Sequence, residues 1–223
     1  MGSHDVAPED GAVRVEEQLR EAVHRLASAE LNEGLREREA RGEFDRRGWQ
    51  RLAEFGIQGM PIPERFGGRG LDALTCVGVL ESLGHACKDN GLVFSANAHL
   101  WTAALPLLEF GSDAQKERFL PGLCDGSKIG GNAMTEPEAG SDAYSLTARA
   151  EKRGDRYVLS GTKCFVTNAS IADLLVVFAT VDPAKGPNGV SAFLVEAGTP
   201  GLSVGPPVAK MGTRTSPTCD VHL

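Results

Sequence analysis

The sequence has few aromatic residues, 6% of 223, and no excess of basic residues. With 23 Lys and Arg against 30 Asp and Glu, the net charge of −7 argues against a nucleic-acid-binding or anionic-membrane surface. No apolar run approaches the roughly 18–20 residues of a membrane span, and the polar N-terminus lacks an apolar signal segment. We therefore expect a globular cytoplasmic protein without a membrane span or a nucleic-acid partner.

The sequence also lacks the common signatures of metal, nucleotide and hydrolase sites. Its five cysteines form no Cys-x-x-Cys pair, and its five histidines form no His-x-x-x-His pair, so we expect no metal site. There is no Gly-x-Gly-x-x-Gly after a strand, no P-loop and no Gly-x-Ser-x-Gly elbow. His85 and His99 lie in apolar helical segments and are predicted to be core or interface residues.

Apolar periodicity predicts helices from about residue 12 to residue 125. A helix with one buried stripe is expected over 13–38, and Asp45 and Gly56 are the expected caps of the next. Capping signals at Asp72 and at Ser112 predict two further helices, the first ending near Cys87 and burying Leu74, Val77, Leu80 and Leu83. Pro106 should kink or end the apolar segment 92–110, and Pro121 with Gly122 should close the last helix.

The pattern changes to strands after about residue 128. Turn residues Lys152 to Asp155 predict a hairpin. The expected strands are 144–151, 156–166, 174–181, 190–195, 202–208 and 218–223. The fold class is therefore α+β: a disordered N-terminus with a tag remnant (1–11), an all-α bundle (12–127) and an antiparallel β-barrel or sandwich (128–223).

The segment Met134 to Asp142 lies where the two halves meet. Pro137 lacks a donor and Gly140 favours positive φ, so this segment is predicted to be a tight loop. Its free N–H groups and the hydroxyls of Thr135 and Ser141 provide hydrogen-bond donors for an anionic or carbonyl-rich ligand. An ordinary polar turn is the alternative for the Gly-Ser-Asp part.

A second segment, Gly161 to Asn168, follows about 20 residues later. Met-Thr-Glu-Pro-x-Ala-Gly-Ser-Asp and Gly-Thr-Lys-x-Phe-Val-Thr-Asn, in this order and spacing, resemble the two flavin-contacting segments of the acyl-CoA dehydrogenase family. The resemblance continues through Asp173 to Val177 and Lys210 to Arg214, and upstream through Ile62 to Gly70. It covers nearly the whole chain after the first ten or so residues.

The resemblance implies FAD as cofactor and α,β-dehydrogenation of an acyl thioester. A carboxylate removes the α-proton while the β-hydride goes to flavin N5, so hydrogen-bond donors must face the thioester carbonyl and the flavin. Ser141 would also bind the substrate, Thr135 would donate to the pyrimidine side of the ring, and Thr167 would lie near N5. The cofactor-binding residues implied are Asn132, Ala133, Met134, Thr135, Gly140, Ser141, Phe165, Val166 and Thr167.

Two of these positions depart from the family pattern. Phe165 stands where many family members have Trp. An aromatic side chain against the flavin ring is kept, but the indole N–H donor is lost, so the resemblance does not specify how the flavin is tuned. Asn132 replaces the frequent Tyr or Phe, so an amide stands at that contact in place of an aromatic ring. Glu136, Glu138 and Asp142 are interpreted as loop hydrogen-bonding residues, and the catalytic base is not identified.

Family members continue into a second helical bundle that supplies the base, so we expect this chain to lack that part and to be inactive alone. The alternatives are a natural half-protein that acts as a binding or assembly subunit, and an acyl-CoA oxidase or flavin N-monooxygenase of the same fold. Expected partners are acyl-CoA or an acyl-carrier-protein thioester, electron-transfer flavoprotein or oxygen as acceptor, and a homo-oligomer or a chain that supplies the bundle. Acyl chain length, branching and thioester carrier are not specified by the sequence.

Overall fold

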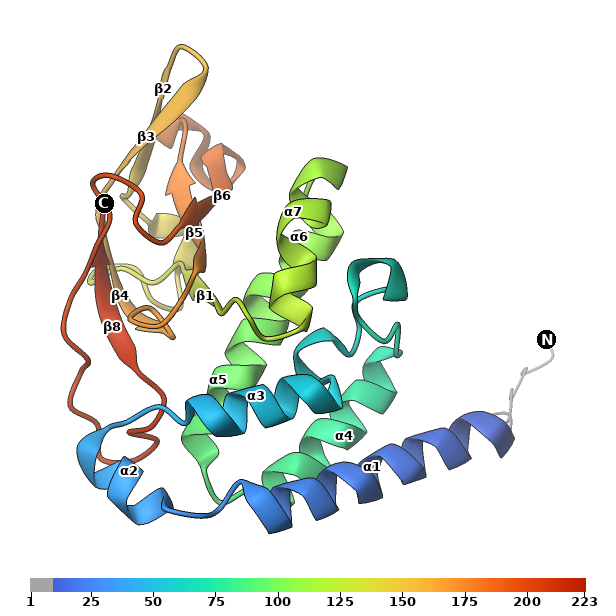
Figure 1. The fold of residues 1–223 in the computed structure, drawn as a ribbon. Helices are drawn as coiled ribbons and strands as arrows, with labels where there is room; N and C mark the ends of the chain where they lie inside the picture. Colours follow the sequence, from blue (N-terminus) through green and yellow to red (C-terminus); the bar gives the residue numbers. More distant parts are fainter. Residues whose placement is uncertain (1–9) are drawn as a thin grey trace, which may run out of the picture.

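The computed structural model describes residues 10–223, with helices in the first half and strands in the second (Figure 1). The helices are α1 (Asp10–Glu30), α2 (Leu35–Arg41), α3 (Arg46–Phe55), α4 (Ala73–Ala86), α5 (Asn90–His99), α6 (Leu105–Phe110) and α7 (Asp113–Cys124). The strands are β1 (Gly130–Ala133), β2 (Arg149–Arg153), β3 (Arg156–Ser160), β4 (Thr162–Thr167), β5 (Leu174–Thr180), β6 (Val190–Glu196), β7 (Ser203–Val204) and β8 (Thr218–His222). This order confirms the predicted fold class. The expected tag remnant lies in residues 1–9, outside the described residues.

The capping signals are confirmed at three helices. Asp45 accepts from the amide of Gly48 at the start of α3, and Gly56 ends that helix with φ 95°. Asp72 accepts from two amides of α4. Ser112 and Gln115 form the capping box of α7. Short polar side chains satisfy amides that have no partner inside a helix, which is why these positions could be read from the sequence.

Helix lengths differ from the prediction at three places. The segment 13–38 is divided, because α1 ends at Glu30 and Gly34 adopts φ 65° before α2. Pro121 lies inside α7 and does not close it. A π-helical turn over Leu100–Ala104 joins α5 to α6, so Pro106 lies in the first turn of α6, where a missing N–H costs little.

The resulting helix Asn90–Phe110 has 21 residues, and its most apolar 18-residue window has a mean hydropathy of 1.2, which is long and apolar enough for a membrane span. The prediction that no apolar run approaches that length is therefore wrong. Half of its most apolar window, 50%, is buried inside the protein. Its place between the other helices and the sheet in Figure 1 is that of a core helix.

The apolar surface of α4 also differs from the prediction. Leu80 and Leu83 are buried, but Leu74 and Val77 are 75% and 55% exposed. The helix instead buries Cys76 and Val79 in the cluster that it shares with α1. His85 is exposed, with its ring 5.7 Å from that of His24, so it is not a core residue, and the interface alternative stays a prediction.

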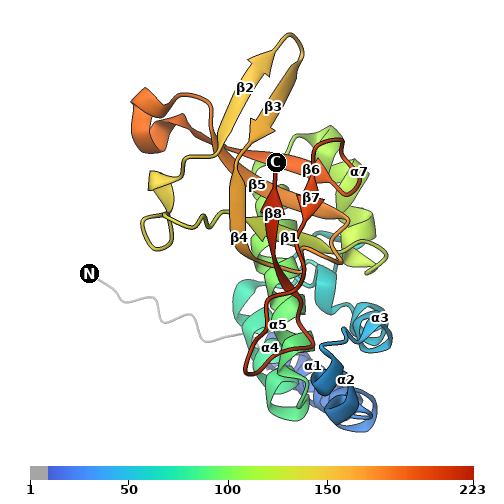
Figure 2. The same cartoon turned by 90° about the vertical axis from the view of Figure 1, so that its left-hand side faces the viewer.

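The strands form two sheets, of which the larger is mixed rather than purely antiparallel and the smaller is antiparallel throughout. In the larger sheet β5 pairs with β1 in parallel and with β6 antiparallel, and the β2–β3 hairpin continues it. The smaller sheet has the order β4–β8–β7, and Figure 2 shows these strands side by side above the helices. The predicted hairpin turn is confirmed at Gly154, whereas the strand expected from Tyr144 begins only at Arg149.

Gly161 divides the strand expected over 156–166 into β3 and β4, which belong to different sheets. It has φ 150°, and a Cβ there would lie 2.7 Å from Cβ of Ala148. The backbone of residue 161 passes so close to Ala148 that no side chain fits, so the change from one sheet to the other requires glycine here. This switch brings β4 beside β1, next to α5.

Candidate flavin and thioester site

A bulge in β4 turns Phe165 out of the sheet. The register with β8 shifts between Lys163 and Val166, and Phe165 has φ 56°, an unfavourable conformation for an aromatic residue. Its side chain is 66% exposed, whereas Cys164 and Val166 beside it are buried. Such strain persists where the surrounding structure holds it, often at binding sites.

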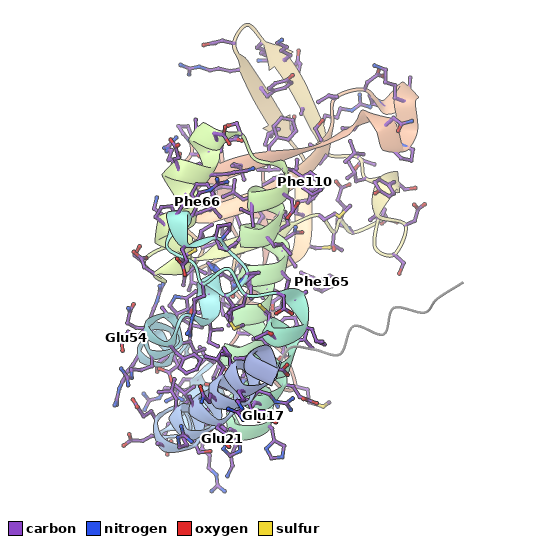
Figure 3. All side chains as sticks on the ribbon, turned by 90° about the vertical axis from the view of Figure 1, so that its right-hand side faces the viewer. Glu17, Glu21, Glu54, Phe66, Phe110 and Phe165 are labelled. Atoms are coloured by element: carbon purple, nitrogen blue, oxygen red, sulfur yellow. The ribbon has the colours of Figure 1, made fainter. Side chains whose placement is uncertain are left out.

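Phe165 lines a cleft between α5 and the β1–β4 region. The cleft has a volume of about 350 Å³. Its lining consists of Phe94, Asn97, Ala98, Trp101, Thr102, Asn132, Phe165 and Thr167. In Figure 3, Phe165 lies beside the helices, and Phe110 lies above it, nearer the sheets. The cleft thus combines three aromatic rings with amide and hydroxyl groups.

The helical wall of the cleft is shaped by the π-helical turn and by Pro106. Asn97 Oδ1 accepts from the indole Nε1 of Trp101 at 3.1 Å, which fixes the ring. Pro106 has no N–H for the carbonyl of Thr102, four residues earlier. That carbonyl accepts from Asn132 Nδ2 at 3.0 Å and so joins the wall to β1. Turns of π-helix are frequently found at functional sites.

His99, the last residue of α5, joins that helix to β1 from inside the core. Its Nδ1 accepts from the amide of Gly130 at 2.9 Å, and its Nε2 lies 3.1 Å from the carbonyl of Leu123. The neutral ring with its proton on Nε2 satisfies both contacts. Burial lowers the pKa of His99 to about 4, although the contact with Leu123 opposes this. The prediction of a core histidine is confirmed here.

Asn168 holds the end of β4 against both walls. It is fully buried with φ 67°, and its Nδ2 donates to the carbonyls of Ser95 at 3.0 Å and Gly130 at 3.2 Å. Ser95 belongs to α5 and Gly130 to β1. One side chain therefore fixes the relative position of the two sides of the cleft.

The segment after β1 forms the tight loop that the sequence predicts. Glu136 and Ala139 exchange two backbone hydrogen bonds, which closes the turn at Pro137 and Glu138. The amide of Cys164 donates to the carbonyl of Thr135 at 2.9 Å, so the loop is attached to the bulge of β4. Gly140 does not adopt positive φ, and that detail of the prediction was wrong.

The structure separates the residues that the sequence analysis named into three groups. Asn132, Phe165 and Thr167 line the cleft. Thr135, Gly140 and Ser141 lie on the adjoining loop, with Thr135 half-buried and the other two exposed. Ala133 and Val166 are buried in the β core, and Met134 directs its carbonyl to Lys163 Nζ at 3.0 Å.

Sequence reasoning missed the helical wall. The segment 92–110 was interpreted as an apolar segment to be buried on several sides. Phe94, Asn97 and Trp101 recur at helical spacing on one face, and this alternation of aromatic and amide residues was a usable signal. Only the packing of α5 beside β4 shows that this face borders a cleft.

Two family models match consecutive parts of the chain. "Acyl-CoA dehydrogenase, N-terminal domain" matches residues 14–127, and "Acyl-CoA dehydrogenase, middle domain" matches residues 131–223. The chain belongs to the acyl-CoA dehydrogenase family. The first model spans the helices, and the second spans the two sheets with the loop and the bulge.

Individual relatives agree with this membership. Mitochondrial isovaleryl-CoA dehydrogenase of Pongo abelii is 37% identical over 98% of this chain and 53% of its own length. The crystal structure of the prolyl acyl carrier protein oxidase AnaB has a TM-score of 0.91 and 46% identity, covering 97% of this chain and 56% of that one. The FAD complex of PigA has a TM-score of 0.91 and 36% identity, covering 98% and 56%. The chain thus spans about half the length of these relatives.

Proposed function

We propose that this chain forms the flavin-contacting and thioester-contacting part of an FAD-dependent oxidoreductase that dehydrogenates an acyl thioester at its α,β bond. The observation that carries the proposal is the outward turn of Phe165 into a cleft that also contains Thr167 and Asn132. Family membership and the likeness to the FAD complex of PigA support FAD as the group bound there.

The residues present fit a flavin. Phe165 offers an exposed aromatic face for a planar ring system, and strained backbone holds it there. Thr167 in the cleft and Thr135 on the adjoining loop are hydroxyl donors for the polar edge of a ring. Bound FAD would supply a two-electron acceptor for the β-hydride. The chain's own residues would orient the ring and keep water from one of its faces.

Over residues 10–223, the cleft does not contain the base that would remove the α-proton of the substrate. Among the described residues, no Asp or Glu lines the cleft. Glu136 is buried and hydrogen-bonded as a loop residue, as the sequence analysis expected. We propose that the base belongs to a part of the enzyme outside this chain. Ser141, exposed beside the site, would contact the thioester.

The thioester carrier and electron acceptor belong to the same proposal. The likeness to isovaleryl-CoA dehydrogenase supports a CoA thioester, and the higher identity to AnaB supports an acyl group on a carrier protein with oxygen as acceptor. Electron-transfer flavoprotein, oligomerisation and a cytoplasmic location remain predictions.

The proposed function is tested on the purified protein supplied with FAD. Isovaleryl-CoA, butyryl-CoA and a prolyl-loaded carrier protein are offered in turn, with an artificial electron acceptor and then with oxygen alone. This chain alone should bind FAD but reduce no acceptor, because no Asp or Glu among the described residues lines its cleft, whereas a longer form that includes the base should reduce the acceptor with at least one thioester. Failure of FAD to bind, seen as unquenched flavin fluorescence, would exclude the proposal for this chain.

Replacing the three hydroxyls should have different effects. Thr135→Val and Thr167→Val should each change the free energy of reduction of the bound flavin by about 1.5–3 kcal/mol, the value of a hydrogen bond to a charged group, and this change is seen as a shift of the reduction potential. Ser141→Ala should weaken thioester binding while most of the flavin stays bound. Spectroscopic redox titration and thioester titration separate these results. Unchanged potentials and affinities with only a lower melting temperature would remove these residues from the site.

Phe165 should show opposite effects on stability and on flavin binding. Phe165→Gly should raise the free energy of unfolding by about 1 kcal/mol, because glycine accepts φ 56° without strain. The same change should weaken FAD binding about tenfold through loss of aromatic contact. Phe165→Trp is the matched control and should keep the affinity. Equal affinity of all three proteins, measured by flavin fluorescence, would show that the ring does not contact the flavin.

A further inference from the structure

Glu136 and Lys163 form an ion pair inside the protein that joins the two sequence motifs. Lys163 is 0% exposed and Glu136 is 5% exposed. Lys163 Nζ donates to Glu136 Oε1 at 2.7 Å. One residue follows β1 at the start of the loop, and the other lies in β4 immediately before the bulge.

Each charge makes further contacts on the loop. Lys163 Nζ also donates to the carbonyl of Met134 at 3.0 Å. Glu136 accepts from the amide and hydroxyl of Thr147 at 2.7 and 2.8 Å, and from the amide of Ala148 at 2.9 Å. Burial alone would raise the pKa of Glu136, but the hydrogen bond from Lys163 and those from Thr147 and Ala148 outweigh it and lower that pKa.

These contacts surround Thr135. The carbonyl before it is bound by Lys163, its own carbonyl accepts from the amide of Cys164 at 2.9 Å, and the residue after it is the ion-pair partner. Thr135 therefore has little freedom to move relative to β4. Phe165 lies two residues after Lys163, within the same bulge.

Stability alone does not account for this arrangement. Burying two charges costs solvation, and a well-packed apolar pair of similar volume is often at least as stable. Two apolar side chains could not hold three backbone groups, the carbonyl of Met134 and the amides of Thr147 and Ala148, at set distances.

We infer that Glu136 and Lys163 are positioning residues that hold the loop 134–142 against the β4 bulge, so that Thr135 and Phe165 keep the separation that flavin binding requires. The inference rests on the proposed function for its flavin measurement only. The order of the loop itself can be measured without flavin.

The decisive experiment compares three variants with the wild-type chain: Lys163→Met, Glu136→Gln and the double variant E136M/K163M. Amide hydrogen exchange of the peptide covering 134–142 measures loop order, and flavin fluorescence quenching measures FAD affinity. Both single variants should increase exchange in this peptide and weaken FAD binding at least tenfold. The double variant should regain thermal stability relative to Lys163→Met, because no unpaired buried charge remains, yet keep the mobile loop and the weak FAD binding.

Arg38→Met is the matched control. Arg38 is a mostly buried cation that pairs with Asp45 at 3.1 Å and Asp89 at 3.5 Å in the helical part. Its loss should lower stability without affecting exchange at 134–142. If E136M/K163M regains stability, loop protection and FAD affinity together, the pair is only structural and the inference is wrong. If wild type shows a protected loop but binds no FAD, the proposed function fails, and the positioning role is overturned only if the variants leave loop protection unchanged.

Discussion

Replacement of Asn168 by Ala is expected to lower the free energy of unfolding by roughly 3–5 kcal/mol. The carbonyls of Ser95 and Gly130 would each lose a buried donor, at about 1–3 kcal/mol apiece. Alanine at φ 67° adds about 1 kcal/mol of backbone strain relative to glycine. Because Asn168 joins β4 to α5 and β1, the cleft should loosen as well.

Urea unfolding of Asn168→Ala and Asn168→Gly measures the two contributions separately. Glycine keeps the left-handed backbone at no cost and loses only the side-chain hydrogen bonds, so it should be the more stable variant by about 1 kcal/mol. Losses below about 1 kcal/mol in both variants would show that the amide contacts contribute little.

Acidification should destabilise the protein through His99. The pKa of His99 is about 4 in the folded protein, against a value of 6.5 for an unperturbed side chain. Above pH 6.5 the ring is neutral in both states and contributes no pH dependence. Below it the unfolded chain binds the proton first, so stability falls as the pH drops from 6.5 to 4, by roughly 3 kcal/mol in total.

The measurement is the difference between wild type and His99→Gln in free energy of unfolding, determined from pH 7.5 to pH 4. Glutamine can accept from the amide of Gly130 and donate to the carbonyl of Leu123, but it does not titrate. The free energy of unfolding of the variant should therefore depend less on pH in this window. The pKa of Glu136 is lowered, so its own contribution is lost only below about pH 4.5. Parallel pH profiles for the two proteins would mean that His99 does not titrate as the buried site requires.

The candidate site could be predicted in part because its chemistry lies in continuous segments. The Thr-Glu-Pro loop and the Gly-Thr-Lys-x-Phe-Val-Thr-Asn segment each have a recognisable order of residues, and Asn132, Phe165 and Thr167 do meet in one cleft. The helical wall with Trp101 was not predicted, because apolar periodicity is the same for a helix face that meets the core and one that borders a cleft.

Several errors have a common origin in packing. Leu74 and Val77 fit the apolar stripe of α4, yet the neighbours of α4 contact its other face. Pro106 was expected to kink or end its helix and follows a π-helical turn that divides it, whereas Pro121 was expected to close α7 and lies inside it. Strand β1 has the sequence Gly-Gly-Asn-Ala, which has no strand propensity of its own and exists through parallel pairing with β5.

The sequence by itself determined that helices in the first half precede strands in the second, and it also determined the caps of α3, α4 and α7, the tight loop after β1 and the family. Those features depend on residues close together in the chain, where a side chain satisfies a neighbouring amide or a glycine permits a turn. The tertiary structure alone decided that Lys163 pairs with Glu136, that Asn168 and His99 join α5 to β1, and that Phe165 faces outward. The contacts of Lys163, Asn168 and His99 depend on groups far apart in sequence whose burial leaves no water to satisfy them, so their partners are set by the packing of the whole chain. Phe165 faces outward because the register between β4 and β8 shifts at the bulge.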